Sequence, residues 1–328
     1  MINKIEENVK ILLKDIFKNG DTIISYRNSG TPEIKTPLFI RNKNDIDFLT
    51  IDNFNVNNLS VYLSKFEQGE IGLAKNNGRI IITAKPCDAK SIIQMISDEQ
   101  IDKERIVLVV YECDGVIDLK KLSRLTGELR QVDANEEYVN FTKLNGETGK
   151  INLNSVLLDK CLEGNCGLPY FYNYYFVGNE KSFKERIIKR SKPHKLIIQT
   201  LKDKKELKQI VENEISKCIR CNACRNICPA CFCSDRCVFD KPKLPVELLE
   251  KDVSLTENVL FHLIRFYHVF PNCTGCGECE RVCPQGIKLN IFYKYINEII
   301  STEFGFTPGS TDSARQPLLS YRLGEDLV

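Results

Sequence analysis

The spacing of hydrophobic and polar residues predicts a helix followed by short strands near the start of the chain. Residues 4–18 place Ile, Val and Leu on one stripe of a helix, and Gly20 follows as a stop signal. A second helical pattern covers residues 58–66. Three short apolar runs are typical of strands, at residues 22–25, 38–40 and 48–51.

Two continuous apolar runs, each followed by a helical pattern, indicate buried strands. Residues 79–84 (RIIITA) lead through Pro86 into a helix near 88–96. Residues 106–111 (IVLVVY) lead into a second helix near 116–122. An alternation of strand, turn and helix is typical of an α/β domain with some parallel pairing.

The pattern changes after residue 125. Residues 126–155 are polar and hairpin-like, ending in a strand at 150–153, and the Lys- and Glu-rich stretch 179–219 is helical with a break at Pro193. Residues 255–270 fit another helix. We therefore expect four parts: an α/β domain over 1–177, a helical linker over 178–215, a mostly α domain over 216–303 and an extended tail over 304–328.

Composition narrows the class of protein. The net charge of the 328 residues is only +2, which argues against a nucleic-acid partner. No stretch approaches the roughly 20 apolar residues that a membrane span needs. The first twenty residues lack the uninterrupted apolar core of a signal peptide. We therefore expect a cytoplasmic protein without a membrane span.

Cysteine is the outlier in this composition. The chain has 15 Cys but only three His. Without a secretory signal, so many cysteines indicate metal ligation or redox chemistry rather than disulfides. An odd number also cannot pair completely within one chain, and the scarcity of His disfavours a His-ligated metal enzyme.

The spacing C-x2-C-x2-C-x3-C-P occurs twice in the last third of the chain. It is the spacing of bacterial two-cluster ferredoxins, in which the fourth Cys of each motif ligates the other cluster. Cluster 1 is therefore assigned Cys218, Cys221, Cys224 and Cys283. Cluster 2 is assigned Cys273, Cys276, Cys279 and Cys228. We expect residues 216–303 to form a mostly α dicluster ferredoxin domain with two [4Fe–4S] clusters; zinc, the alternative, usually takes two separated pairs of ligands.

Four further cysteines come from three loops of the first half: Cys87, Cys113, Cys161 and Cys166. Cys87 and Cys113 follow the predicted strands 79–84 and 106–111, at the end where open α/β sheets place their ligands. Two interpretations are open for this set, a third [4Fe–4S] cluster or four unrelated buried thiols. For three remaining cysteines packing is the favoured role: Cys231, Cys233 and Cys237.

Motifs for catalysis or nucleotide binding are absent from the sequence. No G-x-G-x-x-G follows a strand, and no Ser–His–Asp set or H-E-x-x-H occurs. Residues 145–150 (NGETGK) partly resemble a P-loop, but their glycines are closer together than in that motif. A hairpin turn is therefore favoured. We therefore assign no catalytic residue.

These motifs resemble those of a known family, the iron–sulfur beta subunits of anaerobic formate dehydrogenases and of deazaflavin-dependent hydrogenases. The electron-input subunit of anaerobic sulfite reductase is similar as well. The resemblance covers nearly the whole chain. Besides the second ferredoxin motif and His268, it rests on residues 58–63 (NLSVYL), 85–88 (KPCD), 112–118 (ECDGVID) and the cysteine-rich string 218–233.

The resemblance implies an electron-transfer subunit of an anaerobic complex, not itself catalytic. It would relay electrons between a catalytic partner subunit and an acceptor such as ferredoxin or a flavoprotein subunit. In the hydrogenase relatives a cysteine set of the Cys87, Cys113, Cys161 and Cys166 type ligates a further [4Fe–4S] cluster, with FAD beside it. This chain departs from the family in having four residues between Cys161 and Cys166, where C-x2-C is frequent, and it shows no flavin motif.

Two rival functions are also compatible with the sequence. One is a self-sufficient flavin-dependent reductase or oxidase of a deazaflavin or similar carrier. The other is an interaction scaffold whose clusters are only structural. The sequence names neither the terminal substrate nor the direction of electron flow.

Overall fold

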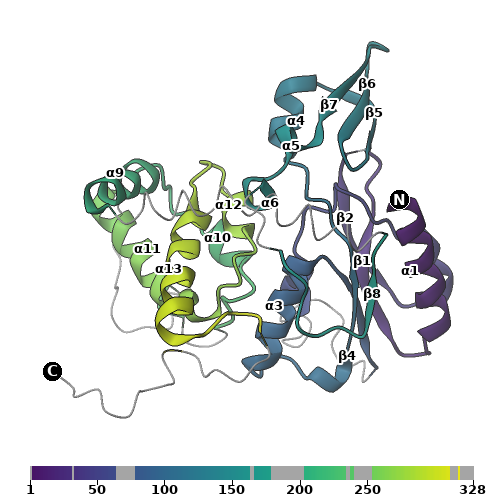
Figure 1. The fold of residues 1–328 in the computed structure, drawn as a ribbon, viewed down its shortest axis with the longest axis horizontal. Helices are drawn as coiled ribbons and strands as arrows, with labels where there is room; N and C mark the ends of the chain where they lie inside the picture. Colours follow the sequence, from purple (N-terminus) through teal and green to yellow (C-terminus); the bar gives the residue numbers. More distant parts are fainter. Residues whose placement is uncertain are drawn as a thin grey trace.

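The computed structural model describes residues 2–31, 33–63, 78–162, 166–178, 203–233, 237–239, 253–310 and 317. An N-terminal domain of sheets and helices lies beside a C-terminal group of helices, with helix α3 (Pro86–Ser97) between them (Figure 1). The Ser91 hydroxyl of α3 lies 2.9 Å from that of Thr274 in the C-terminal part. In the described part of the chain, no helix is both long and apolar enough to cross a membrane.

A five-stranded sheet in the order β2-β1-β3-β4-β8 forms the centre of the N-terminal domain. Four strands are parallel to their neighbours: β1 (Thr22–Asn28), β3 (Ile80–Ala84), β4 (Ile106–Tyr111) and β8 (Tyr174–Phe176). The edge strand β2 (Lys35–Ile40) pairs antiparallel with β1. The parallel pairing expected between the two apolar runs is confirmed, with Ala84 opposite Val110 at their carboxyl ends.

Helices cover both faces of this sheet, which explains why its strands are apolar without alternation. On one face, Ile81 and Val109 pack with the side chains of α1 (Ile2–Ile16). On the other face, Ile82 and Leu108 pack with the side chains of α3. Successive strand residues thus enter opposite cores, and α3 lies between the sheet and the C-terminal helices (Figure 1).

A three-stranded antiparallel sheet follows β4 and projects from the domain (Figure 1). Its strands are β5 (Leu129–Ala134), β6 (Tyr138–Lys143) and β7 (Thr148–Asn152). Short helices flank it: α4 (Leu119–Thr126), α5 (Leu153–Val156) and α6 (Asp159–Leu162). The expected hairpin region is confirmed, and the NGETGK segment is the β6–β7 turn with the start of β7.

Two elements differ from the predictions. Of the strand expected at 48–51, Phe48 ends the 3₁₀ helix η1 (Lys43–Phe48), whose first turn is capped by Asn42, and residues 49–51 form no strand. Only one bridge, from Leu49 to Arg27, remains there. The helix expected from 116 begins at Leu119, because the Asp118 carboxylate accepts the amides of the first turn.

Helices and loops make up the C-terminal part. They are α9 (Lys204–Ile215), α10 (Ala223–Asn226), α11 (Leu255–Val269), η4 (Phe270–Asn272), α12 (Glu278–Arg281) and α13 (Leu289–Phe304). Residues 203–233 and 253–310 contain no strand. Of the expected linker, α9 is helical, whereas residues 179–202 with the break at Pro193 lie outside the described residues. A helix was also expected at 58–66. Residues 61–63 are helical, and residues 64–66 lie outside the described residues.

The segment after α13 returns to the N-terminal domain. Gly305 ends α13 in the left-handed region, with φ 64°. The Gly309 amide then donates to the Gln94 side chain of α3 at 2.8 Å, and Phe306 is buried. Residues 305–310 of the expected extended tail therefore pack against the chain itself, and most of the tail beyond them is outside the described residues.

Candidate metal centres

The two ferredoxin motifs adopt the same local conformation. In each, a loop with two left-handed residues leads into a one-turn helix, α10 or α12. The left-handed residues stand at equivalent places, Arg220 and Asn222 in the first motif and Gly275 and Gly277 in the second. Left-handed residues tighten a loop, so each motif can direct three of its thiols toward a common point.

The thiols of the two motifs come together in an exchanged arrangement. One cavity is lined by Cys218, Cys221, Cys224 and Cys283. A second cavity is lined by Cys228, Cys273 and Cys276. The fourth thiol of this second group, Cys279, interacts electrostatically with those three. The structure thus gathers the eight thiols into the two groups that the spacing predicts, and their ligation of clusters stays a prediction.

Side chains from other elements hold the backbone of these cysteines. Each donates a hydrogen bond to the carbonyl of a different motif cysteine: Asn258 to Cys218 at 2.8 Å, Arg265 to Cys224 at 2.9 Å, Asn297 to Cys273 at 2.7 Å and Lys160 to Cys276 at 2.6 Å. The loops are therefore fixed from outside, as metal ligands usually are. Sequence reasoning missed all four donors, because nothing in the local pattern marks which polar residue turns inward.

Burial makes these thiols costly to ionise in the absence of metal. It raises the pKa of Cys273 to about 12 and that of Cys279 well above its usual value. The buried Arg265 guanidinium acts in the opposite direction on both. Metal ligation requires thiolates, and the iron of a bound cluster would supply the positive charge that stabilises them.

The second cysteine set meets at the carboxyl ends of β3 and β4. Cys87 is the second residue of α3 and Cys113 lies two residues beyond β4. Cys161, in α6, accepts a hydrogen bond from the Val116 amide at 3.3 Å. The thiols of Cys87 and Cys166 form a hydrogen bond, and Cys113 interacts electrostatically with Cys87 and Cys161. The structure therefore brings all four cysteines together.

The donor set suits a cluster better than a single ion. Among the described residues, no three His, Cys, Asp or Glu side chains are placed to share one metal ion. A cubane offers four separate iron corners, each taking one thiolate. The four converging thiols of this set match a [4Fe–4S] cluster in number and in kind. The hydrogen bond from Cys166 already lowers the pKa of Cys87, whereas burial raises that of Cys113.

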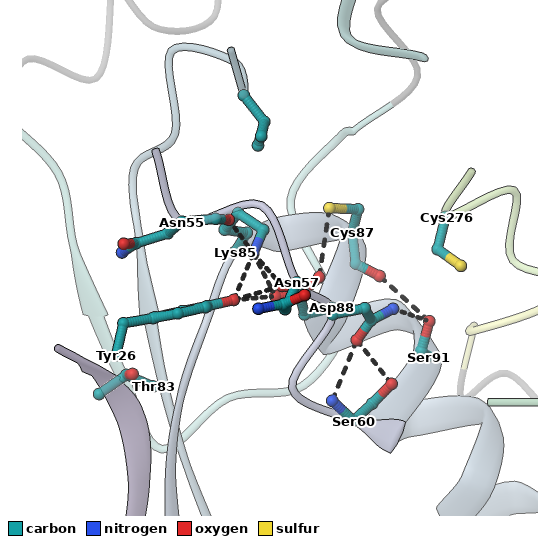
Figure 2. A network of polar contacts seen from close by, with 12 residues as sticks. Tyr26, Asn55, Asn57, Ser60, Thr83, Lys85, Cys87, Asp88, Ser91 and Cys276 are labelled. Carbon is teal, nitrogen blue, oxygen red and sulfur yellow. Dashed lines mark hydrogen bonds and ion pairs between the residues drawn. The ribbon is translucent and has the colours of Figure 1, made fainter. Parts of the chain in front are cut away.

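A buried ion pair fixes the turn that carries Cys87. Lys85 and Asp88 are each 1% exposed at the side chain and lie 2.8 Å apart. The Lys85 ammonium also donates to the Tyr26 hydroxyl at 2.6 Å and to the carbonyls of Asn55 and Asn57 at 2.9 and 2.8 Å (Figure 2). This network explains the KPCD sequence: Pro86 starts the helix, and the flanking charges anchor Cys87 at its N-terminus.

The three unassigned cysteines form no cluster group of their own. Cys237 is buried, and Cys231 interacts electrostatically with Cys228 and Cys237. No disulfide joins any two cysteines of the described residues. The packing role expected for Cys231, Cys233 and Cys237 stays a prediction.

Comparisons with known proteins agree with the resemblance. The 4Fe-4S dicluster domain family matches residues 214–287, which contain both ferredoxin motifs. The chain is 24% identical over 296 residues to the F420-dependent formate dehydrogenase subunit beta of Methanocaldococcus jannaschii, covering 74% of this chain and 76% of the relative. It is 22% identical over 295 residues to the F420-dependent formate dehydrogenase 1 subunit beta of Methanococcus maripaludis, covering 73% of this chain and 75% of the relative.

A solved structure is also similar over part of the chain. It is a xenon-derivatised F420-reducing [NiFe] hydrogenase complex from Methanosarcina barkeri, matched over 49% of this chain and 61% of that one. The TM-score is 0.36 at 12% identity. The two sequence relatives and the dicluster domain carry the assignment. The chain is therefore an iron–sulfur protein related to the beta subunits of formate dehydrogenases.

Proposed function

We propose that this chain is the electron-transfer subunit of an anaerobic oxidoreductase complex of the formate dehydrogenase or hydrogenase type. It connects a catalytic partner subunit with an acceptor such as ferredoxin or a flavoprotein subunit. The observation that carries the proposal is the gathering of twelve cysteines into three groups of four. The similarity to formate dehydrogenase beta subunits supports it.

The role of each group follows from its position. The ferredoxin groups hold clusters 1 and 2, and the set of Cys87, Cys113, Cys161 and Cys166 holds a third. When bound, each [4Fe–4S] cluster supplies a one-electron carrier. The chain contributes the thiolates, a buried surrounding, and two buried cations, Lys160 and Arg265, that offset the negative charge.

Redox cycling of the full chain tests this function. Protein prepared without oxygen is reduced with dithionite, followed by electron paramagnetic resonance, and reoxidised with oxidised ferredoxin. We expect every cluster to be reduced and then reoxidised. Clusters that keep one oxidation state throughout would contradict the proposal and favour a structural role.

Two variants assign the signals in that experiment. Cys276→Ala removes a proposed ligand of cluster 2 and is expected to abolish or alter that signal. Cys237→Ala removes a buried thiol that lies outside the three groups, and all signals are expected to persist. Equal loss in both variants would show that the thiols act only in packing.

A cavity between the domains favours a second candidate, a flavin-dependent reductase or oxidase. The cavity measures about 440 Å³, within the range of small-molecule sites. Its lining includes more cations than carboxylates, the cations being Lys120, Lys121, Arg124, Lys160, Arg281 and Lys288. Because Lys and Arg bind phosphate, a flavin nucleotide matches this lining. Stoichiometric flavin, released by acid from protein reconstituted with FAD, would support this candidate, and its absence would remove it.

A further inference from the structure

A buried lysine lies between the N-terminal cysteine set and the second ferredoxin motif. Lys160 precedes Cys161 in α6. Its ammonium group donates to the Cys276 carbonyl at 2.6 Å and lies 3.3 Å from the Glu278 carboxylate. One short stretch of chain therefore touches a proposed ligand of the third cluster and a proposed ligand of cluster 2.

The second motif is shaped around this lysine. A Cβ atom added to Gly277 would lie only 2.7 Å from Lys160 Cδ and 3.1 Å from its Cβ. The glycine between Cys276 and Glu278 thus makes room for the lysine stem as well as adopting a φ of 70°. This close contact shows that α6 and the motif loop are packed as one unit.

A second contact joins the same two cysteine groups. The Ser91 hydroxyl donates to the Cys87 carbonyl at 3.3 Å. It also lies 2.9 Å from the hydroxyl of Thr274, a residue of the loop from Cys273 to Cys276. Asn58, from the NLSVYL segment, donates to the same hydroxyl at 3.3 Å. Figure 2 shows Ser91 on α3 below Cys87, with Cys276 across from them. The two cysteine groups are therefore fixed to each other on two sides.

A net positive charge is left beside both groups. Glu278 is fully buried and pairs with Arg281 at 2.7 Å as well as with Lys160. Two cations and one carboxylate thus leave about one positive charge between the groups. The charges that act most strongly on Lys160 are those of Glu278, Cys87, Cys161 and Cys276. A charge buried this deeply is poorly screened by water and salt.

We propose that Lys160 is a positioning residue that couples the N-terminal centre to cluster 2 and raises the reduction potential of both through its positive charge. The inference rests on the proposed function, because it requires a cluster in each cysteine group. Reduction adds one electron, and hence one negative charge, to a cluster. A fixed cation nearby stabilises the reduced form more than the oxidised form, so the potential rises.

The test is a redox titration of the full, cluster-loaded chain followed by electron paramagnetic resonance. Lys160→Met removes the charge and the hydrogen bond, Lys160→Gln removes the charge but keeps a donor, and Lys160→Arg keeps the charge. We expect Met and Gln to lower the potentials of the N-terminal centre and cluster 2, with cluster 1 unchanged. Lys160→Arg is expected to keep potentials close to those of the wild type.

Lys208→Met is the matched control. Lys208 also pairs with a glutamate, Glu212, but its side chain is 75% exposed, so its charge is screened and its removal is expected to move no potential. Cys87→Ala and Cys276→Ala identify which couple belongs to which centre. If Lys160→Met fails to retain its clusters, Lys160→Gln gives the same comparison with a hydrogen-bond donor still available to the Cys276 carbonyl.

The outcomes separate this inference from the proposed function. Suppose that the wild type shows three redox couples. If the Met and Gln variants then leave all three reduction potentials unchanged, or shift them equally, the role of Lys160 is overturned and the proposed electron-transfer function is unaffected. Two couples in the wild type would overturn the third centre itself, and the inference with it.

Discussion

Two buried cations lie between the three cysteine groups. Arg265, which is 1% exposed, donates to the Cys224 carbonyl and interacts electrostatically with Cys228 and Cys279. It thus lies between the two ferredoxin groups, as Lys160 lies between the second of them and the N-terminal set. Buried charges are costly unless they are compensated, and clusters bound by four thiolates would compensate both.

The matched pair Gly275 and Gly277 tests the packing around Lys160. Both glycines are left-handed, with φ 69° and 70°. A Cβ at Gly275 would meet nothing within 4 Å, whereas one at Gly277 would meet the Lys160 stem. Gly275→Ala should therefore cost only the left-handed conformation, about 1–2 kcal/mol. Gly277→Ala should cost about 1–3 kcal/mol more, because it overpacks the contact.

The unfolding free energies of both variants, from denaturant titration, give this difference. In a Lys160→Ala background the excess cost of Gly277→Ala should shrink, because the Cδ contact is gone. An equal loss of unfolding free energy in the two glycine variants, or an unchanged loss in that background, would show that α6 is not packed tightly against the loop of the second motif.

Replacing Lys85 by Met should destabilise the N-terminal domain by about 3–5 kcal/mol. The substitution leaves the buried Asp88 carboxylate without its cation. Lys10→Met is the control, because the Lys10–Glu6 pair is on the surface of α1 and is worth only about 0.2–1 kcal/mol. Thermal unfolding of the two variants measures the contrast, and similar losses would refute the structural role of the KPCD turn.

Helix α3 connects three parts of the molecule. Its N-terminus carries Cys87, its middle contacts Thr274 through Ser91, and its end binds the segment after α13 through Gln94. The sequence predicted the helix itself within two residues at its start and one at its end, from the apolar strand before it and from Pro86. The contacts could not be predicted, because each partner is far away in the chain.

Removing the Gln94 side chain should release the segment 305–310 from α3. Gln94→Ala deletes the acceptor of the Gly309 amide and leaves that buried amide unpaired, at a cost of about 1–3 kcal/mol. Limited proteolysis should then cut this segment faster than in the wild type, with Ser97→Ala, at the exposed last residue of α3, as the control. Unchanged cleavage would show that Phe306 and its neighbours hold the segment without Gln94.

Local signals explain which elements could be predicted. The strands before Cys87 and Cys113 are continuous apolar runs, and each ferredoxin group follows from a spacing rule that acts within a few residues. The strand expected at 48–51 is wrong because Phe48 ends a 3₁₀ helix and Leu49 forms only a single bridge, to Arg27. Lys160 and Arg265 gave no signal, because a single charged residue in a short helix looks like a solvent-exposed one.

At the scale of the whole molecule, the second ferredoxin group lies between the other two cysteine groups. Contacts through Lys160 and Ser91 join it to the N-terminal set. Arg265 interacts with Cys224 of the first group and Cys279 of the second. We therefore expect the order N-terminal centre, cluster 2, cluster 1. Because the thiol groups come from both domains, their assembly depends on how the domains pack, which the sequence of either domain alone does not give.

The iron content of the full chain, prepared and reconstituted without oxygen, tests the central claim most directly. Three [4Fe–4S] clusters predict about twelve irons and as many acid-labile sulfides per chain. In that case Cys87, Cys113, Cys161 and Cys166 hold a cluster beside the dicluster domain. About eight irons per chain would contradict the account and reduce that set to four buried thiols.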